Sequence, residues 1–477
     1  MNDRPPLSWT VTDVLNATGG QLAFGQDSVL FSDVSIDSRS LSAGALFVAI
    51  QGKNHDGHAF VAQAVQQGAG GILIHKDQAD AFSSGPFRQT RVVCIAVDDS
   101  IRALGDLAAY HRQRSDISII AITGSNGKTT TKEMTAAVVS RCFATLSSAG
   151  NFNNEIGLPL SMLKIGPDHR WAVLELGMNR PGEIRRLAEI CSPDIAVITN
   201  IGTAHLAGVG SVEGVMHAKG ELLEKMKPGA RAVLNGDDAK VLQLARRITG
   251  ETLFFGTSQN ARVRALGVGL KDSGVSFELA LFEERVPIDL KVTGKFMVLN
   301  ALAAAAAGHL AGVPLRKIQA GLNAFTPLAG RMNVIKTDRG IHIIDDSYNA
   351  NPDSMAAAIT SLVSLKGSGR KTLVAGDMHE LGEYSESMHR KIGALSSRAG
   401  VDKLYVTGQF APYVVQGAKS ENNSKPEIFV GTREEILKDL TGWLQPGDWV
   451  LVKGSRAQAM ETIVSGLTES LHQAGTV

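Results

Sequence analysis

The stretch from Ile117 to Thr131 reads ISIIAITGSNGKTTT and decides the central part of the fold. Residues 117–122 are mostly apolar and β-branched, which is typical of a buried strand, and the run from Lys128 onward reads as the start of a helix. A glycine-framed turn between strand and helix directs backbone N–H groups and the positive end of the helix dipole toward one point. The stretch therefore predicts a phosphate-binding loop in an α/β domain.

Each polar or glycine residue of this loop has a predicted task. Gly124 and Gly127 let the backbone approach phosphate oxygens closely. Lys128 would reach the outer phosphates and Thr129 would offer a hydroxyl to Mg²⁺. A full Walker A motif would place a glycine at Ile122, so this loop is a shortened G-x-x-G-K-T. The alternative is a glycine-rich turn with an incidental lysine, but the register of strand, turn and helix favours ATP. The predicted ATP-binding residues here are Gly124, Ser125, Asn126, Gly127, Lys128, Thr129 and Thr130.

Composition narrows the class of protein. A chain of 477 residues exceeds what one hydrophobic core usually serves, so two or three domains are expected. The formal net charge of +1, without charge blocks, argues against nucleic acid or anionic membranes as main partners. Three scattered cysteines favour a reducing compartment and no structural zinc. We find neither a signal segment nor a run long enough to span a bilayer, and expect a cytoplasmic protein.

Turn signals and strand–helix alternation divide the chain into three predicted α/β domains. The first, 1–113, is small and carries a polar island at Asp37, Ser38 and Arg39 after an apolar run, although ordinary turn chemistry is the commoner explanation for such residues. The second, 114–327, reads as a P-loop ATPase-like parallel sheet with an Ala-rich buried helix near its end. The third, 328–477, reads as a Rossmann-like open α/β sheet of five strands without a dinucleotide fingerprint.

Polar residues follow the apolar runs of the second segment. Glu175 ends WAVLEL, Asn200 ends DIAVITN, and His205 comes shortly after. Ligands collect beyond the carboxyl ends of parallel strands, so these residues are candidates to share a site with the loop. A carboxylate at the end of an apolar run is costly unless it is paired, and beside Thr129 metal ligation is the favoured interpretation for Glu175. His205 and Lys219 receive no role from the sequence pattern alone.

A series of motifs resembles the Mur ligase family, ATP-dependent enzymes that form the peptide bonds of the bacterial cell-wall precursor. The resemblance rests on GSNGKTTTKE, LELGMNRPGEI, TNIGTAHL, AKGEL, LNGDD, Gly330-Arg331, DDSYNANPDSM, GDMHELG and KGSR, in this order. Within the family, NFNNEIGLP, DSYNANP, GDMHELG and KGSR are similar to the member that adds D-alanyl-D-alanine to UDP-N-acetylmuramoyl-tripeptide. The D-N-P-R motif of the sibling that adds the third amino acid does not occur.

The resemblance implies a reaction and its cofactors. ATP would phosphorylate the terminal carboxylate of the UDP-linked tripeptide, and the D-alanyl-D-alanine amine would then attack the acyl phosphate. The implied catalytic residues are Lys128, Glu175, His205, Lys219 and Arg331. Two Mg²⁺ ions are implied, with Thr129, Glu175, His205 and a carbamylated Lys219 as ligands. We expect a monomer without membrane insertion.

The remaining implied assignments concern the two ends of the substrates. The adenosine part would contact Asn300, Asp346, Tyr348 and Asn349, and Arg331 would neutralise charge on the γ-phosphate. The acceptor and dipeptide would contact Ser38, Arg39, Asn153, Asn154, Asp377, Lys453, Ser455 and Arg456. One stretch departs from the family pattern, because Phe296 and Met297 stand where relatives carry His-Asn, and we expect weaker or differently shaped adenine recognition.

Two other functions fit part of this pattern. A non-catalytic ATP-binding protein of a larger assembly would need the loop, but it has no physical need for a two-metal site. A folate polyglutamate-adding ligase shares a related core and lacks the first domain with its Asp-Ser-Arg loop. Phosphate release that depends on D-alanyl-D-alanine would distinguish the ligase from the first alternative. Binding of UDP would distinguish it from the second.

Overall fold

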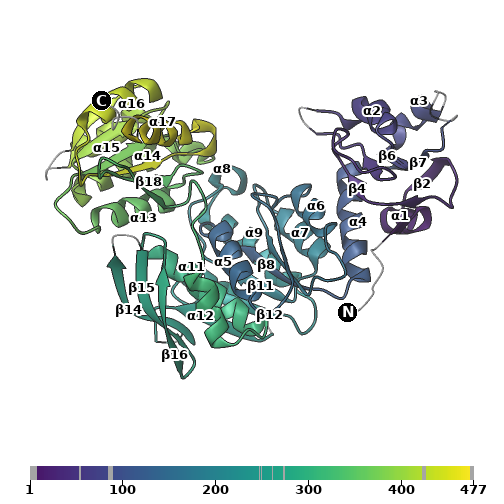
Figure 1. The fold of residues 1–477 in the computed structure, drawn as a ribbon, viewed down its shortest axis with the longest axis horizontal. Helices are drawn as coiled ribbons and strands as arrows, with labels where there is room; N and C mark the ends of the chain where they lie inside the picture. Colours follow the sequence, from purple (N-terminus) through teal and green to yellow (C-terminus); the bar gives the residue numbers. More distant parts are fainter. Residues whose placement is uncertain are drawn as a thin grey trace.

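The computed structural model describes residues 8–52, 55–83, 87, 90–246, 248, 250–259, 261–271, 274–421 and 426–472. The outer bounds of the predicted first and third domains, residues 1 and 477, lie outside these ranges. Three sheets with flanking helices follow one another along the chain, and Figure 1 shows the central one between the N-terminal and C-terminal ones. Within the described ranges, no helix has both the length and the apolar composition to cross a membrane.

The N-terminal sheet has five strands in the order β2-β7-β6-β5-β4, and only β2 runs antiparallel to its neighbour. A separate antiparallel pair joins β1 to β3. Helix α4 begins where Asp99 accepts from two backbone amides, and it buries Leu104 and Leu107. The elements are β1 Trp9–Thr10, α1 Val11–Thr18, β2 Gln21–Phe24, β3 Leu30–Phe31, β4 Val34–Ser35, β5 Leu46–Val48, α2 Val61–Gln66, β6 Gly71–His75, α3 Ala79–Ser83, β7 Val93–Val97 and α4 Ser100–Arg114.

The central sheet has nine strands in the order β16-β15-β14-β13-β12-β11-β8-β10-β9. Its elements are β8 Ser118–Thr123, α5 Lys128–Val139, β9 Thr145–Ser147, α6 Gly157–Met162, β10 Trp171–Glu175, α7 Glu183–Cys191, β11 Ile195–Ile198, α8 Leu206–Val209, α9 Val212–Glu224, β12 Arg231–Asn235, α10 Ala239–Ala245, β13 Thr252–Gly256, β14 Val263–Lys271, β15 Gly274–Leu281, β16 Glu284–Leu290, α11 Phe296–Leu310 and α12 Leu315–Asn323.

The central sheet is parallel from β9 to β14, as expected, and one edge carries antiparallel strands that were not predicted. Strands β14, β15 and β16 pair antiparallel and extend the sheet away from the loop. Along β16, buried Val286, Ile288 and Leu290 alternate with exposed residues, which is the pattern of an antiparallel strand with one wet face. This alternation is visible in the sequence, and it distinguishes β16 from the continuous apolar run of β8.

The predicted Ala-rich buried helix is α11, which packs against α5. Small side chains allow the two helices to approach closely: a Cβ added to Gly308 would lie 2.5 Å from Val138 Cγ1. Because α5 begins at the phosphate-type loop, this close packing brings the first turn of α11, with Asn300, against that loop.

The C-terminal sheet has six strands in the order β17-β18-β22-β19-β20-β21. The five predicted strands are all present and parallel, and β17, which the sequence analysis did not predict, is added antiparallel at the edge. The elements are β17 Asn333–Lys336, β18 His342–Asp346, α13 Pro352–Val363, β19 Lys371–Ala375, α14 Ser385–Ala399, β20 Lys403–Val406, α15 Ala411–Ser420, β21 Glu427–Val430, α16 Arg433–Trp443, β22 Trp449–Lys453 and α17 Glu461–His472.

Candidate functional site

Two side chains from other parts of the chain, Thr199 and Asn300, pack directly against the glycines of the loop between β8 and α5. Gly124 has φ +152 and Gly127 has φ +78. A Cβ at Gly124 would lie 1.8 Å from Thr199 Oγ1, and a Cβ at Gly127 would lie 2.2 Å from Asn300 Oδ1. Both glycines are therefore required by neighbouring side chains as well as by backbone conformation.

Two amides of the loop are already bound within the protein. Ser125 N donates to Asn200 O at 2.9 Å, and Asn126 N donates to Asn200 Oδ1 at 2.9 Å. Thr199 Oγ1 donates to Asn126 O at 2.6 Å. These two amides thus have acceptors in the protein, whereas amides of the first turn of α5 have no acceptor within the helix. The ATP-binding roles of the loop residues stay predictions.

Lys128 lies at that start and folds back over the loop. Its Nζ donates to Gly124 O at 2.9 Å. Burial lowers the pKa of Lys128, the Glu175 carboxylate opposes this shift, and the Arg331 guanidinium adds to it. Lys128 therefore has a weak neutral partner and a carboxylate nearby, an arrangement in which an incoming phosphate oxygen would be a better acceptor than the carbonyl.

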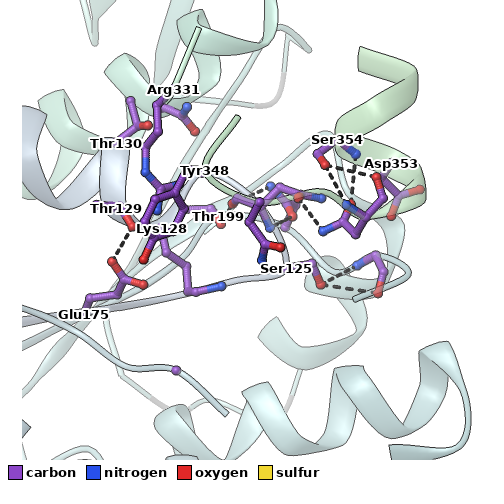
Figure 2. Close-up of a pocket in the computed structure, with 18 of the residues that line it drawn as sticks. Ser125, Lys128, Thr129, Thr130, Glu175, Thr199, Arg331, Tyr348, Asp353 and Ser354 are labelled. Carbon is purple, nitrogen blue, oxygen red and sulfur yellow. Dashed lines mark hydrogen bonds between the residues drawn. The ribbon is translucent and has the colours of Figure 1, made fainter. Parts of the chain in front are cut away.

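Glu175 and Thr129 form the oxygen-rich corner of the site. Thr129 Oγ1 donates to Glu175 Oε2 at 2.7 Å, the contact drawn at the left of Figure 2, and Asn153 Nδ2 donates to Glu175 Oε1 at 2.8 Å. Glu175 is 2% exposed. These oxygens fit the partial ligand set that Mg²⁺ takes beside phosphates and water. Among the described residues, no group of three or more His, Cys, Asp or Glu side chains could hold a metal ion without such help.

His205 and Lys219 come from the segment after β11. His205 lines the cavity, and its Nδ1 lies 2.6 Å from Glu380 Oε2. Lys219, on α9, is fully buried, and its Nζ has no hydrogen-bond partner among the described residues. Burial lowers the pKa of Lys219 well below its usual value, with a further contribution from Lys128 and opposition from Glu175. Lys219 does not line the cavity, but it lies within electrostatic reach of it.

The C-terminal segment supplies the opposite wall. The Arg331 guanidinium lies over the Tyr348 ring, 4.2 Å from its centroid, and both stand above Lys128 in Figure 2. Lys453 Nζ donates to Asp346 Oδ2 at 2.6 Å and to Asn349 O at 2.8 Å. Burial raises the pKa of Asp346, and the Lys453 ammonium opposes that rise. Because the Lys453 ammonium already has these two partners, it fixes the loop after β18.

The two walls are joined by direct hydrogen bonds across the cavity rim. Asn351 Nδ2 donates to Asn126 Oδ1 at 2.8 Å, and Thr203 N donates to Asp353 Oδ2 at 2.6 Å. The cavity between the central and C-terminal sheets has a volume of about 630 Å³. Its lining includes these predicted site residues: Ser125, Asn126, Gly127, Lys128, Thr129, Thr130, Asn153, Asn154, Glu175, His205, Asn300, Arg331, Asp346, Tyr348, Asn349, Lys453 and Arg456. Phe296 and Met297, which differ from the His-Asn of the family pattern, also line this cavity.

Four predicted substrate residues lie outside this cavity. In the N-terminal domain, Ser38 Oγ donates to Gln63 Oε1 at 2.9 Å, and the exposed Arg39 is paired with Asp37 at 2.8 Å. In the C-terminal domain, the predicted dipeptide residues Asp377 and Ser455 form hydrogen bonds within the protein. The buried Asp377 carboxylate accepts from Gln409 N at 2.7 Å, and Ser455 Oγ accepts from His379 N at 2.8 Å. The roles of Ser38, Arg39, Asp377 and Ser455 stay predictions.

Several residues of the site were given no role from the sequence, and three of them make contacts that shape it. Thr199 closes the loop, Asp353 joins the two walls, and Glu380 contacts His205. Asp353 and Glu380 belong to the motifs DDSYNANPDSM and GDMHELG, so the sequence marked their segments. Their partners lie in another domain, which a local motif does not indicate.

Family models match three successive parts of the chain. Residues 31–112 match the model described as Mur ligase family, catalytic domain, residues 122–308 match the Mur ligase middle domain, and residues 330–456 match the Mur ligase, glutamate ligase domain. A UDP-N-acetylmuramoyl-tripeptide--D-alanyl-D-alanine ligase of Bacillus subtilis is 36% identical over 462 residues, covering 97% of this chain and 98% of the relative.

Solved structures agree with the sequence comparison. MurF from Acinetobacter baumannii superposes with a TM-score of 0.88 at 34% identity, covering 98% of this chain and 100% of that chain. MurF ligase from Thermotoga maritima, in complex with ADP, gives a TM-score of 0.82 at 29% identity, covering 93% and 98%. With family models on all three parts and a relative above 30% identity over nearly the full length, this chain belongs to the Mur ligase family.

Proposed function

We propose that this chain is the ATP-dependent ligase that adds D-alanyl-D-alanine to UDP-N-acetylmuramoyl-tripeptide in peptidoglycan synthesis. The observation that carries the proposal is the cavity between two sheets, in which Lys128, Glu175 and His205 of one side face Arg331 of the other. The proposal includes three domains, 1–113, 114–327 and 328–477, a cytoplasmic location and a monomeric enzyme.

The proposed reaction has two steps. The terminal carboxylate of the tripeptide attacks the γ-phosphorus of ATP, giving an acyl phosphate and ADP. The amine of D-alanyl-D-alanine then attacks the acyl carbon, and the tetrahedral intermediate expels phosphate to leave an amide. No protein nucleophile is needed, so catalysis consists of positioning and charge stabilisation.

The residues of the loop and of the facing wall divide this work. Amides of the first turn of α5 and the Lys128 ammonium would bind the β- and γ-phosphates. Arg331 would neutralise charge on the γ-phosphate, with its guanidinium held over Tyr348. Asn300, Asp346, Tyr348 and Asn349 would surround the adenosine part.

Mg²⁺ fits the oxygen corner of the site. Thr129 and Glu175, already 2.7 Å apart, would hold one ion. His205 and a carbamylated Lys219 would hold a second. The neutral amine is the form of lysine that reacts with carbon dioxide, and a buried, unpartnered Nζ favours that form. When bound, the ions would neutralise the charge that develops on the transferred phosphoryl group.

The substrate ends are assigned to the remaining predicted residues. Ser38 and Arg39 would bind the UDP moiety, and Asn153 and Asn154 would face the acceptor peptide. The dipeptide end would be formed by the loops that contain Asp377, Lys453, Ser455 and Arg456. Because Lys453 is bound to Asp346, we propose that it acts on the dipeptide through the shape of this loop.

A coupled assay tests the proposal. Phosphate release is measured with ATP, a panel of UDP-tripeptides, and D-alanyl-D-alanine present or omitted. Release that requires all three substrates, with formation of UDP-pentapeptide by mass spectrometry, supports the ligase. Release that ignores the dipeptide would refute it and favour a protein that uses ATP only to set domain orientation.

A further inference from the structure

The loop between β19 and α14 reaches from the C-terminal domain to the segment that carries His205. Glu380 makes this contact twice. Its side-chain Oε2 lies 2.6 Å from His205 Nδ1, a charge contact in which this nitrogen has no aligned hydrogen bond among the described residues, and its carbonyl oxygen accepts from Ala207 N at 2.9 Å. Gly382 follows closely, since a Cβ there would lie 3.4 Å from Ala207 Cα. The loop is therefore packed onto this segment through main chain and side chain.

Both partners of the side-chain contact have left-handed backbones. His205 has φ 59 and Glu380 has φ 62, in a region that residues with a Cβ seldom occupy. Such conformations persist only where the surroundings impose them. Here they turn the two side chains toward one another across the junction of two domains, at one point of the cavity rim.

The charge environment links this pair to the loop lysine. The contact with His205 lowers the pKa of Glu380, burial opposes the shift, and the Lys128 ammonium contributes to it. Glu380 is consequently a carboxylate in the neighbourhood of the phosphate-type loop. It does not line the cavity, whereas His205 does, so Glu380 reaches the cavity only through His205.

We propose that Glu380 is a positioning residue, supplied by the C-terminal domain, that fixes His205 with its proton on Nδ1 and its lone pair on Nε2. A carboxylate oxygen only accepts, and at 2.6 Å its negative charge repels a nitrogen lone pair and attracts an N–H, so the contact favours the tautomer with the proton on Nδ1. The two ring nitrogens point in diverging directions, which leaves Nε2 as the nitrogen able to bind a cation in the cavity. The identity of that cation rests on the proposed function; the tautomer does not.

The proposal gives domain docking a chemical consequence. The contact between His205 and Glu380 exists only while the C-terminal domain rests on the central one, as it does here beside the Thr203–Asp353 hydrogen bond. Undocking would release the imidazole from its carboxylate. The domain proposed to bring adenosine and dipeptide contacts would thus also orient a side chain at the acceptor end of the site.

Three variants test the proposal. Glu380→Met removes the acceptor at nearly constant length, Glu380→Gln keeps an oxygen that can accept from Nδ1, and Glu383→Met is the matched control at an exposed carboxylate of the same loop. In Glu380→Met we expect kcat to fall by about 10- to 100-fold, with the KM for ATP changed much less. Glu380→Gln should recover part of kcat, and Glu383→Met should behave like the wild type.

A second readout does not depend on activity. Nitrogen-15 spectra of histidine-labelled protein, with the His205 signal identified by its loss in His205→Gln, report which ring nitrogen carries the proton. We expect the Nδ1–H form in the wild type and in Glu380→Gln, and loss of that preference in Glu380→Met. An unchanged tautomer in Glu380→Met would overturn the proposal and leave Glu380 as a docking contact. Wild-type kcat in that variant would also overturn it. A wild-type enzyme without ligase activity would refute the proposed function, but it would not alter the tautomer result.

Discussion

Lys219 provides a prediction that can be tested without substrates. Its side chain is 0% exposed, and its Nζ has no hydrogen-bond partner among the described residues. Burial lowers its pKa well below the ordinary 10.5, Lys128 lowers it further, and Glu175 opposes the shift. Burial without a partner therefore favours the neutral amine in the folded protein, and this amine would become an ammonium when the chain unfolds.

The sign and size of the effect follow from this difference. At any pH between the folded and unfolded pKa values of Lys219, unfolding takes up a proton, so the free energy of unfolding rises with pH in that window. The slope is about 1.4 kcal/mol per pH unit for one site. Lys219→Met removes the site, so at a pH between the folded and unfolded pKa values of Lys219 this variant should take up about one proton fewer than the wild type on unfolding.

Direct proton counting suits a chain of several domains, because it does not assume a two-state transition. Protein is unfolded by guanidinium in buffer depleted of carbon dioxide, and proton uptake is recorded in a pH-stat. The matched control is Lys225→Met, which removes a partly exposed lysine, paired with Glu189, at the end of the same helix. Equal uptake by the wild type and Lys219→Met would mean that Lys219 is charged in the folded protein. That result would remove the basis for carbamylation.

Further predictions concern the loop and the domains. Lys128→Ala should abolish ATP turnover and keep the circular dichroism of the wild type, and a near-normal rate would exclude the loop as the phosphate site. Gly127→Ala should impair turnover and cost at least about 1–2 kcal/mol of stability, because the alanine would have a left-handed backbone and its Cβ would lie 2.2 Å from Asn300 Oδ1. Adding Asn300→Ala should relieve only the steric part of this cost. The control is Gly229→Ala, which has a similar φ and no atom within 4 Å of the new Cβ. Lys219→Ala should lose ligase activity that short carboxylates partly restore; no rescue at any concentration would contradict the carbamate. Nucleotide with UDP-substrate should compact the protein in X-ray scattering, and unchanged profiles would contradict ligand-driven closure.

The parts of the fold that could be predicted are those in which local pattern and tertiary environment agree. The run before Gly124 is buried on both faces, so its continuous apolar sequence identified a central strand. Glu175 and His205 follow the ends of apolar strands, and the rule for the carboxyl ends of parallel strands was enough to bring both residues to the loop. Strand β17 and the antiparallel edge β14–β16 were missed. The alternation of buried and exposed residues along β16 is visible in the sequence, but the strand with which each of them pairs depends on the edges of the folded sheet.

Contacts between domains were the other part that could not be predicted. Asp353 and Glu380 lie in motifs with no local need for a carboxylate, and their partners Thr203 and His205 are distant in sequence and belong to another sheet. Which two loops meet is decided by how whole domains pack. The sequence therefore indicated which segments matter, whereas the pairing of their side chains came from the structure.

The shortened loop has a structural cause, and that cause explains why the site needs so many side-chain cations. Ile122, where a full Walker A motif would have glycine, is a buried residue of β8 that is in register with Glu175 of β10. The turn thus begins only at Gly124, and Asn200 takes the amides of Ser125 and Asn126. A loop with fewer free amides gives less backbone stabilisation to a phosphate, so more of the charge must be met by the first turn of α5, by Lys128, and by groups from outside the loop. We propose that Arg331, which comes from the C-terminal segment, is such a group, and a short loop would then make phosphoryl transfer depend on domain docking in a way that a self-sufficient P-loop would not.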